Sequence, residues 1–151
     1  MRARKLRDDE KPQVYEALLR SAIAPDHLCR RAVDECRLVP FVQTLPPVLH
    51  GIRPLIAFFA LRRRASGIAL GRRIYVRQNL FGRDGHLPLV LVTHEVAHVV
   101  QYLRDGTLPF LIRYLTEYLG ARLKGLADRE AYLSISYEEQ ARYVERFLDE
   151  A

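Results

Sequence analysis

The sequence predicts a single α+β domain over residues 10–151, mostly helical, with a small β-hairpin or sheet beside one central helix. Residues 1–9 are rich in charged side chains and predict a flexible tail before it. Residues 87–104 are almost continuously apolar, which is typical of a helix buried on all sides. In residues 68–77, apolar side chains recur at every second position on either side of Gly71, which is the period of a half-buried strand. Most other segments carry apolar residues at helical spacing, which predicts further helices around these two elements.

The N-terminal part predicts two helices. Pro12 fits the first turn of a helix that runs to about Ala24. Pro25 interrupts this helix and begins a second one, which reaches about Leu38. Prolines at 40, 46 and 47 then predict an irregular connection.

Residues 68–77 (IALGRRIYVR) predict a strand in which Gly71 introduces a bend. A turn over residues 79–86 should follow, because it contains two glycines and an Asp-Gly pair. A strand at this place would lie along the central helix and offer its edge to an extended peptide. The two sets of alternating residues are Ile68, Leu70, Ile74 and Val76 on one parity and Arg73, Tyr75 and Arg77 on the other.

The C-terminal half predicts three helices. Pro88 opens the central helix and Gly106 ends it. An amphipathic helix is expected over residues 109–123, and a last helix over residues 136–149.

The central helix carries the sequence HEVAH at residues 94–98. His94 and His98 are four residues apart, so both imidazoles lie on one helix face and can reach a single ion. This is the H-E-x-x-H zinc signature, in which the glutamate, here Glu95, serves as general base toward a water on the metal. Core histidines that bond to backbone or carboxylate partners are the alternative interpretation.

A zinc site of this kind needs a third protein ligand. The extended signature with a glycine and a third histidine is excluded, because Gln101 and Arg104 occupy those positions. A glutamate on a later helix is the remaining common solution. The candidates are Glu117, Glu130, Glu138, Glu139 and Glu145.

HEVAHVVQY, followed some forty residues later by AYLSISYEEQA, resembles the small bacterial gluzincin-type metallopeptidase domains and the DUF4157-like group. The similarity covers roughly residues 68–143. It implies a Zn²⁺ cofactor, with His94, His98 and Glu138 as ligands and Glu95 as catalytic base. Glu139 is the alternative third ligand.

The resemblance also implies an acidic or histidine partner for a ligating histidine just after the E-x-x-A phrase, but this chain has Arg142 there. That departure leaves open what orients the histidine. Tyr132 and Tyr137 flank the expected ligand, and either hydroxyl could stabilise an oxyanion, although ordinary packed tyrosines are the preferred interpretation.

Two functions from different classes follow. The first is a zinc-dependent endopeptidase that acts on a peptide or protein. The second is an inactive zinc-containing module that acts through a partner or a membrane surface. Its contact surface would be residues 48–61 (VLHGIRPLIAFFAL) with the basic residues 62–64, although a core helix with a basic end is the preferred explanation of this segment. The sequence does not define an oligomeric state.

The bulk composition limits partners and compartment. A net charge of +6 permits contact with nucleic acid, but no nucleic-acid motif accompanies it, so no such partner is expected. Cys29 and Cys36 are too far apart for a disulfide within one helix and fit a reducing, cytoplasmic setting. A second metal site with His27 is the alternative for these thiols. Neither a signal peptide nor a transmembrane segment is expected. The basic residues considered for nucleic acid are Arg72, Arg73, Arg77 and Arg83.

Overall fold

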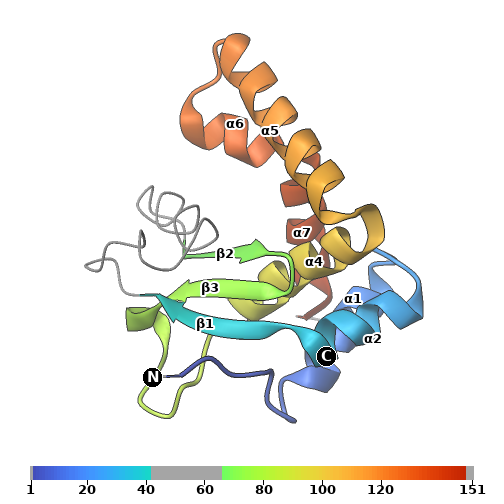
Figure 1. Cartoon of the computed structure of the whole chain (residues 1–151), viewed down its shortest axis with the longest axis vertical. Helices are drawn as coiled ribbons and strands as arrows, with labels where there is room; N and C mark the ends of the chain where they lie inside the picture. Colours follow the sequence, from blue (N-terminus) through green and yellow to red (C-terminus); the bar gives the residue numbers. More distant parts are fainter. Residues whose placement is uncertain (1, 42–65, 149–151) are drawn as a thin grey trace.

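The computed structural model describes residues 2–41 and 66–148. They form an α+β fold in which helices outweigh a three-stranded sheet (Figure 1), so the expected fold class is confirmed. Residues 48–61 and 62–64, which the sequence offered as a contact surface, lie outside the described residues.

The helix α4 (Leu89–Asp105) lies at the centre of the fold, as predicted. Pro88 precedes its first turn, and Gly106 ends it with a φ of 90°, a value that suits glycine. One side of α4 packs on α1 (Lys11–Arg20) and α2 (Asp26–Glu35), and another on α7 (Ser136–Glu145). Its contacts with the sheet complete the enclosure of its apolar side chains.

Residues 68–77 form a hairpin of two strands, so the prediction of one bent strand was wrong. The strands are β2 (Gly67–Leu70) and β3 (Arg73–Arg77), which pair antiparallel with Leu70 opposite Arg73. Gly71 has a φ of 65° and starts the two-residue turn between them. Reversal of the chain sends Ile74 and Val76 into the main core, whereas Leu70 joins Tyr75 in a separate cluster on the other face of the sheet.

A third strand, β1 (Arg37–Phe41), was not predicted. α2 ends at Glu35, and Cys36 is already extended, so the second helix is shorter than expected. β1 pairs parallel with β3, which makes the order β1-β3-β2. Pro40 within it suits an outer strand, where a missing N–H disturbs no central ladder.

The N-terminal residues lie against the domain, an arrangement that differs from the expected flexible tail. The backbone of Arg4 exchanges two hydrogen bonds with Leu38, at 3.0 and 2.7 Å. The Arg4 guanidinium lies 3.0 Å from the Glu10 carboxylate, and Leu6 is buried in the main core.

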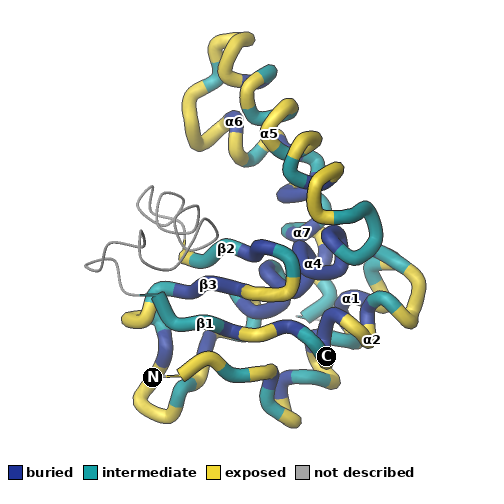
Figure 2. The backbone as a smooth tube through the Cα atoms, in the orientation of Figure 1, coloured by how far each residue is buried: buried dark blue, intermediate teal, exposed yellow. Residues whose placement is uncertain are grey.

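The helices α5 (Thr107–Leu123) and α6 (Asp128–Ser134) form a hairpin that projects away from the sheet (Figures 1 and 2). The helix α6 was not predicted. The chain then returns to the core as α7, which continues into the short 3-10 helix η3 (Arg146–Leu148) instead of remaining α-helical to residue 149. Another 3-10 turn, η2 (Gln78–Leu80), follows β3.

One face of α5 is apolar and exposed. Its large aliphatic side chains recur at helical spacing, and each is about half exposed or more: Leu108, Ile112, Leu115, Leu119 and Leu123. Within residues 2–41 and 66–148, no helix combines the length and apolar character needed to cross a membrane.

Truncation of Leu38 should show that β1 belongs to the core. Leu38 is fully buried, so Leu38→Ala should lower the free energy of unfolding by about 2–5 kcal/mol. Val39 lies on the opposite face of the same strand and is only partly buried, which makes Val39→Ala the matched control with a smaller loss. Chemical denaturation measures both, and equal losses would contradict the assigned register.

Candidate metal centre

Three side chains from two helices converge in the core. His94 and His98 lie one turn apart on α4, and Glu138 comes from the first turn of α7. The Nε2 atom of His94 lies 2.9 Å from Glu138 Oε2, and the Nε2 atom of His98 lies 3.1 Å from Oε1. Their ligand atoms all lie within 4.8 Å of one another, so this group could hold a metal ion.

The opposite ring nitrogen of each histidine has its own partner. His98 Nδ1 lies 2.8 Å from Gln101 Oε1, and His94 Nδ1 lies 2.6 Å from Glu145 Oε1. Both partners are acceptors, so each Nδ1 donates its N–H. Each imidazole is therefore oriented with Nε2 toward Glu138, which is the nitrogen available for a cation.

The orientation of the Gln101 amide is fixed by its other contacts. Its Nε2 donates to the backbone carbonyl of Tyr137 at 3.0 Å and to Gln140 Oε1 at 2.9 Å. A carbonyl oxygen can only accept, so the amide nitrogen must face Tyr137 and the amide oxygen must face His98. This arrangement determines the tautomer of a neutral His98.

Two tyrosine hydroxyls complete the hydrogen bonding of Glu138. Tyr114 on α5 donates to Oε1 at 2.8 Å, and Tyr132 on α6 donates to Oε2 at 2.9 Å. Each carboxylate oxygen therefore contacts one imidazole and one phenol. The projecting hairpin thus contributes to the centre from both of its helices.

Glu95 lies beside the cluster and is almost fully buried. Its Oε2 atom has no hydrogen-bond partner among the described residues. A Cβ atom at Gly67 on β2 would lie 3.6 Å from Glu95 Cγ, so the start of β2 packs against this carboxylate. Burial raises the pKa of Glu95, although the charges of His98 and His94 oppose the shift. A carboxylate in such surroundings readily accepts a proton.

The histidines and Glu138 shift each other's pKa in opposite directions. Burial alone would lower the pKa of His94, but its hydrogen bonds to Glu138 and Glu145 raise it to about 10. Burial likewise opposes ionisation of Glu138, yet the charge of His98 and the hydrogen bonds from both imidazoles hold its pKa well below the usual range. The site thus favours a carboxylate facing positive charge.

The structure distinguishes among the glutamates considered as third ligand. Glu138 is buried in the cluster, whereas its neighbour Glu139 is exposed. Glu117 accepts hydrogen bonds from Ser136 at the start of α7, and Glu130 is exposed. The remaining candidate, Glu145, contacts the outer nitrogen of His94.

The two tyrosines singled out in the sequence differ in position. Tyr132 reaches Glu138, as described above, whereas the Tyr137 hydroxyl does not, which agrees with a packed tyrosine at that position. The Tyr137 hydroxyl donates to Asp105 at 2.8 Å, and its ring stacks on Phe110. Neighbouring residues of a helix point in different directions, so Tyr137 does not follow Glu138 into the cluster. It points instead toward the C-terminal end of α4, where Asp105 lies.

Sequence reasoning missed the contact of Tyr114 and the role of Glu145. Tyr114 reaches Glu138 only because α5 and α7 cross, and no local pattern reports that crossing. For Glu145 a signal existed, since it follows Glu138 by seven residues, nearly two helical turns. That spacing places both carboxylates on one face of α7.

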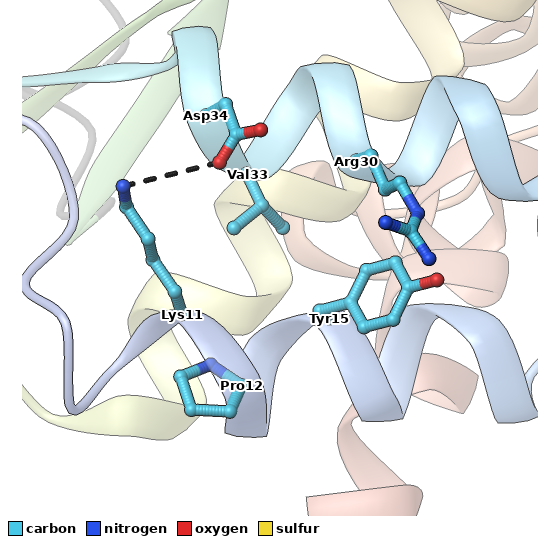
Figure 3. Close-up of a pocket in the computed structure, with 6 residues that line it drawn as sticks. All are labelled: Lys11, Pro12, Tyr15, Arg30, Val33 and Asp34. Carbon is cyan, nitrogen blue, oxygen red and sulfur yellow. Dashed lines mark ion pairs between the residues drawn. The ribbon is translucent and has the colours of Figure 1, made fainter.

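The rest of the surface that the described residues form contains no comparable cluster. A shallow hollow between α1 and α2 is lined by side chains that contact one another: Lys11 lies 3.9 Å from Asp34, and the Arg30 guanidinium lies over the Tyr15 ring (Figure 3).

Of the arginines considered for nucleic acid, Arg72 lies 3.3 Å from Glu35. Arg73 and Arg77 stand at opposite ends of β3, about 13 Å apart at the usual rise per residue.

The cysteines form no second metal site in the part of the chain that the structure describes. Cys29 and Cys36 are buried free thiols that contact backbone carbonyls of Ala24 and Val33, and His27 is exposed. The group of His94, His98 and Glu138 is the one cluster with metal-ligand geometry found among residues 2–41 and 66–148.

Comparisons with other proteins do not add a family: no protein-family model, no curated protein and no solved structure matches the chain. The similarity to gluzincin-type domains therefore stays a prediction from the motifs.

The raised pKa of His94 predicts how the free energy of unfolding depends on pH. A group with a raised pKa in the folded state stabilises fully below its unfolded pKa of 6.5 and loses that effect as the pH rises toward 10. In protein treated with a chelator, the free energy of unfolding should therefore fall from pH 6.5 to pH 8. Urea denaturation measures it, within a range below the titration of unfolded cysteines at about pH 8.5.

The matched control is His94→Asn, which removes the titrating ring. We expect a shallower dependence on pH in this variant than in the wild type. Identical slopes in the two proteins would contradict the assigned pairing of His94 with the two glutamates.

Proposed function

We propose that this chain is a zinc-dependent peptidase. The observation that carries the proposal is the convergence of two imidazole Nε2 atoms on Glu138, with Glu95 buried beside them and its Oε2 atom without a hydrogen-bond partner among the described residues. His₂Glu is a ligand set of catalytic zinc sites, which keep one position open for water. A buried carboxylate oxygen that lacks a hydrogen bond is energetically costly, and a role of Glu95 in proton transfer would explain why it is retained.

The donor atoms of the centre are of the kinds that zinc binds. Imidazole and carboxylate are ligands that suit this ion, and each imidazole has a hydrogen-bonded outer nitrogen, as ligating histidines require. A bound zinc ion would polarise a substrate carbonyl and lower the pKa of a water molecule. Its ligands in this chain would be His94, His98 and Glu138.

Glu95 would handle the proton during hydrolysis. As the water oxygen bonds to the carbonyl carbon, Glu95 accepts a proton from that water. It then delivers the proton to the amide nitrogen as the C–N bond breaks, which leaves a carboxyl group and an amine. The raised pKa of Glu95 suits both steps, because it brings the affinity for a proton closer to neutral pH.

Among the described residues at the centre, the side chains differ in exposure. Glu95, His98 and Glu138 are almost fully buried, whereas the side chain of His94 is 13% exposed and Tyr132 is 37% exposed. A substrate carbonyl would therefore approach past His94 and Tyr132. There the Tyr132 hydroxyl could turn from Glu138 and donate to the developing oxyanion.

A second candidate is a metal-containing interaction module without catalysis. The exposed apolar face of α5 favours it, because a contiguous apolar surface often marks a site of contact with another molecule. Glu95 argues for the peptidase, since a structural metal requires no buried carboxylate at its side. The two candidates predict the same metal content and different turnover.

Zinc content and peptide hydrolysis, measured on the same variants, should separate the role of Glu138 from that of Glu95. Purified wild type should hold about one zinc per chain, as an isolated three-ligand site does, and Glu138→Ala should hold markedly less. Glu95→Gln should keep its zinc but lower peptide hydrolysis by roughly 10²–10⁴-fold, because only proton transfer is lost. Elemental analysis gives the zinc content, and a diverse peptide library read by mass spectrometry gives hydrolysis.

The exposed neighbour supplies the control for these variants. Glu139→Gln should match the wild type in zinc content and hydrolysis. A wild type that takes up no zinc even after zinc is added would overturn the proposal. Zinc in full with turnover unaffected by Glu95→Gln would overturn the role of Glu95.

The two tyrosines give a further test within the same reaction. Tyr132→Phe should lower kcat by on the order of 10²-fold, the usual effect of removing one oxyanion donor. Tyr137→Phe should leave kcat unchanged, because its hydroxyl contacts Asp105 and not Glu138. Steady-state hydrolysis measures both, and equal rates in the two variants would remove Tyr132 from the mechanism.

A further inference from the structure

Glu145 contacts the nitrogen of His94 that faces away from Glu138. Its Oε1 atom lies 2.6 Å from His94 Nδ1, closer than the 2.9 Å between His94 Nε2 and Glu138. The Glu145 side chain is 27% exposed, so this contact lies at the solvent-facing side of the buried cluster. His94 is thus bridged between two carboxylates of α7.

The geometry of α7 explains how one helix reaches both nitrogens. Glu138 and Glu145 are seven residues apart, so they lie on one face and about 10 Å apart along the axis. Their side chains converge on the His94 ring between them, with Nε2 toward Glu138 and Nδ1 toward Glu145. Helix α4 supplies the ring and α7 supplies both of its acceptors.

The basic side chain between these two glutamates serves another contact. Arg142 Nη2 donates to the backbone carbonyl of Leu133 at 2.6 Å, near the C-terminal end of α6. This bond ties α7 to the helix that carries Tyr132. Arg142 therefore points toward α6 and not toward His94. The side chain of α7 that contacts His94 Nδ1 is Glu145.

We propose that Glu145 is a positioning residue for the metal centre, which holds the Nδ1–H of His94 so that Nε2 points at the ion. This inference rests on the proposed function, because it assumes that His94 ligates a metal. A carboxylate that accepts from a ligating imidazole fixes the ring, selects the tautomer and increases the electron-donating power of the ligating nitrogen. Glu145 itself is no ligand, since it lies across the ring from Glu138.

Gln101 performs the corresponding task for His98, but with a neutral amide. Its oxygen accepts from His98 Nδ1 at 2.8 Å. The two histidines therefore have unlike supports: a charged, partly exposed one for His94 and a neutral, buried one for His98. Since a carboxylate is the stronger acceptor, we expect the larger effect on metal affinity per hydrogen bond from Glu145.

The experiment is zinc affinity by competition with a chromophoric chelator, for full-length wild type, Glu145→Ala, Glu145→Gln and Glu139→Gln. Glu145→Ala should bind zinc about 10–100-fold more weakly, the usual effect of losing such a partner. Glu145→Gln should fall between Glu145→Ala and wild type, because its amide oxygen still accepts from Nδ1–H. Glu139→Gln should match the wild type, since this side chain is exposed on the same helix.

Imidazole NMR of the zinc-loaded proteins adds a readout that a general structural role would not change. Wild type should show a slowly exchanging Nδ1 proton on His94, which Glu145→Ala should lose while His98 keeps its own. Zinc affinity of Glu145→Ala within about threefold of the wild type, with the His94 proton retained, would overturn the positioning role. Urea denaturation of the chelator-treated variants checks that each one folds.

The outcomes separate this inference from the proposed function. A wild type that binds zinc but hydrolyses no peptide overturns the peptidase and leaves the expected order of zinc affinities as support for Glu145. A wild type that binds no zinc overturns both. Equal affinities in a wild type that hydrolyses peptides overturn the inference alone.

Discussion

A buried imidazole needs a partner for each of its two ring nitrogens, and α4 places two imidazoles within an apolar core. The partners come almost entirely from α7 or from α4 itself. Glu138 faces both Nε2 atoms, Glu145 faces one Nδ1, and Gln101 faces the other. Helix α7 must therefore pack with one face along the polar stripe of α4, and the register between these two helices is determined by these bonds.

The rest of the chain supports this pair of helices. Helices α1 and α2 cover the apolar sides of α4, and the sheet closes another side with β2 against Glu95. The hairpin of α5 and α6 leaves the core and returns to it, and each of its helices directs a tyrosine hydroxyl at Glu138. An acceptor that four donors share is well satisfied, so Glu138 can remain ionised where an isolated carboxylate could not.

Features that depend on residues close together in the sequence could be predicted from it. The bounds of α4 follow from a proline at one end and a glycine at the other, and Glu138 could be preferred over Glu139 from its place in the E-x-x-A phrase. A small hairpin or sheet was predicted, but the chain reversal at Gly71 was missed. Apolar residues of one parity, on the two sides of Gly71, lie on opposite faces of the sheet once the chain reverses. β1 was missed because five residues with a proline contain no period, and its pairing with β3 is not local.

The charges at the centre indicate why a divalent cation suits it. The carboxylates of Glu138 and Glu145 face the two imidazoles of His94 and His98. With both imidazoles protonated, two positive charges meet two negative ones. One divalent cation bound to neutral imidazoles contributes the same two positive charges, so exchange of two protons for the ion leaves the net charge of the cluster unchanged. A buried cluster of this composition is therefore suited to two alternative occupants, protons or a metal ion, and pH decides between them.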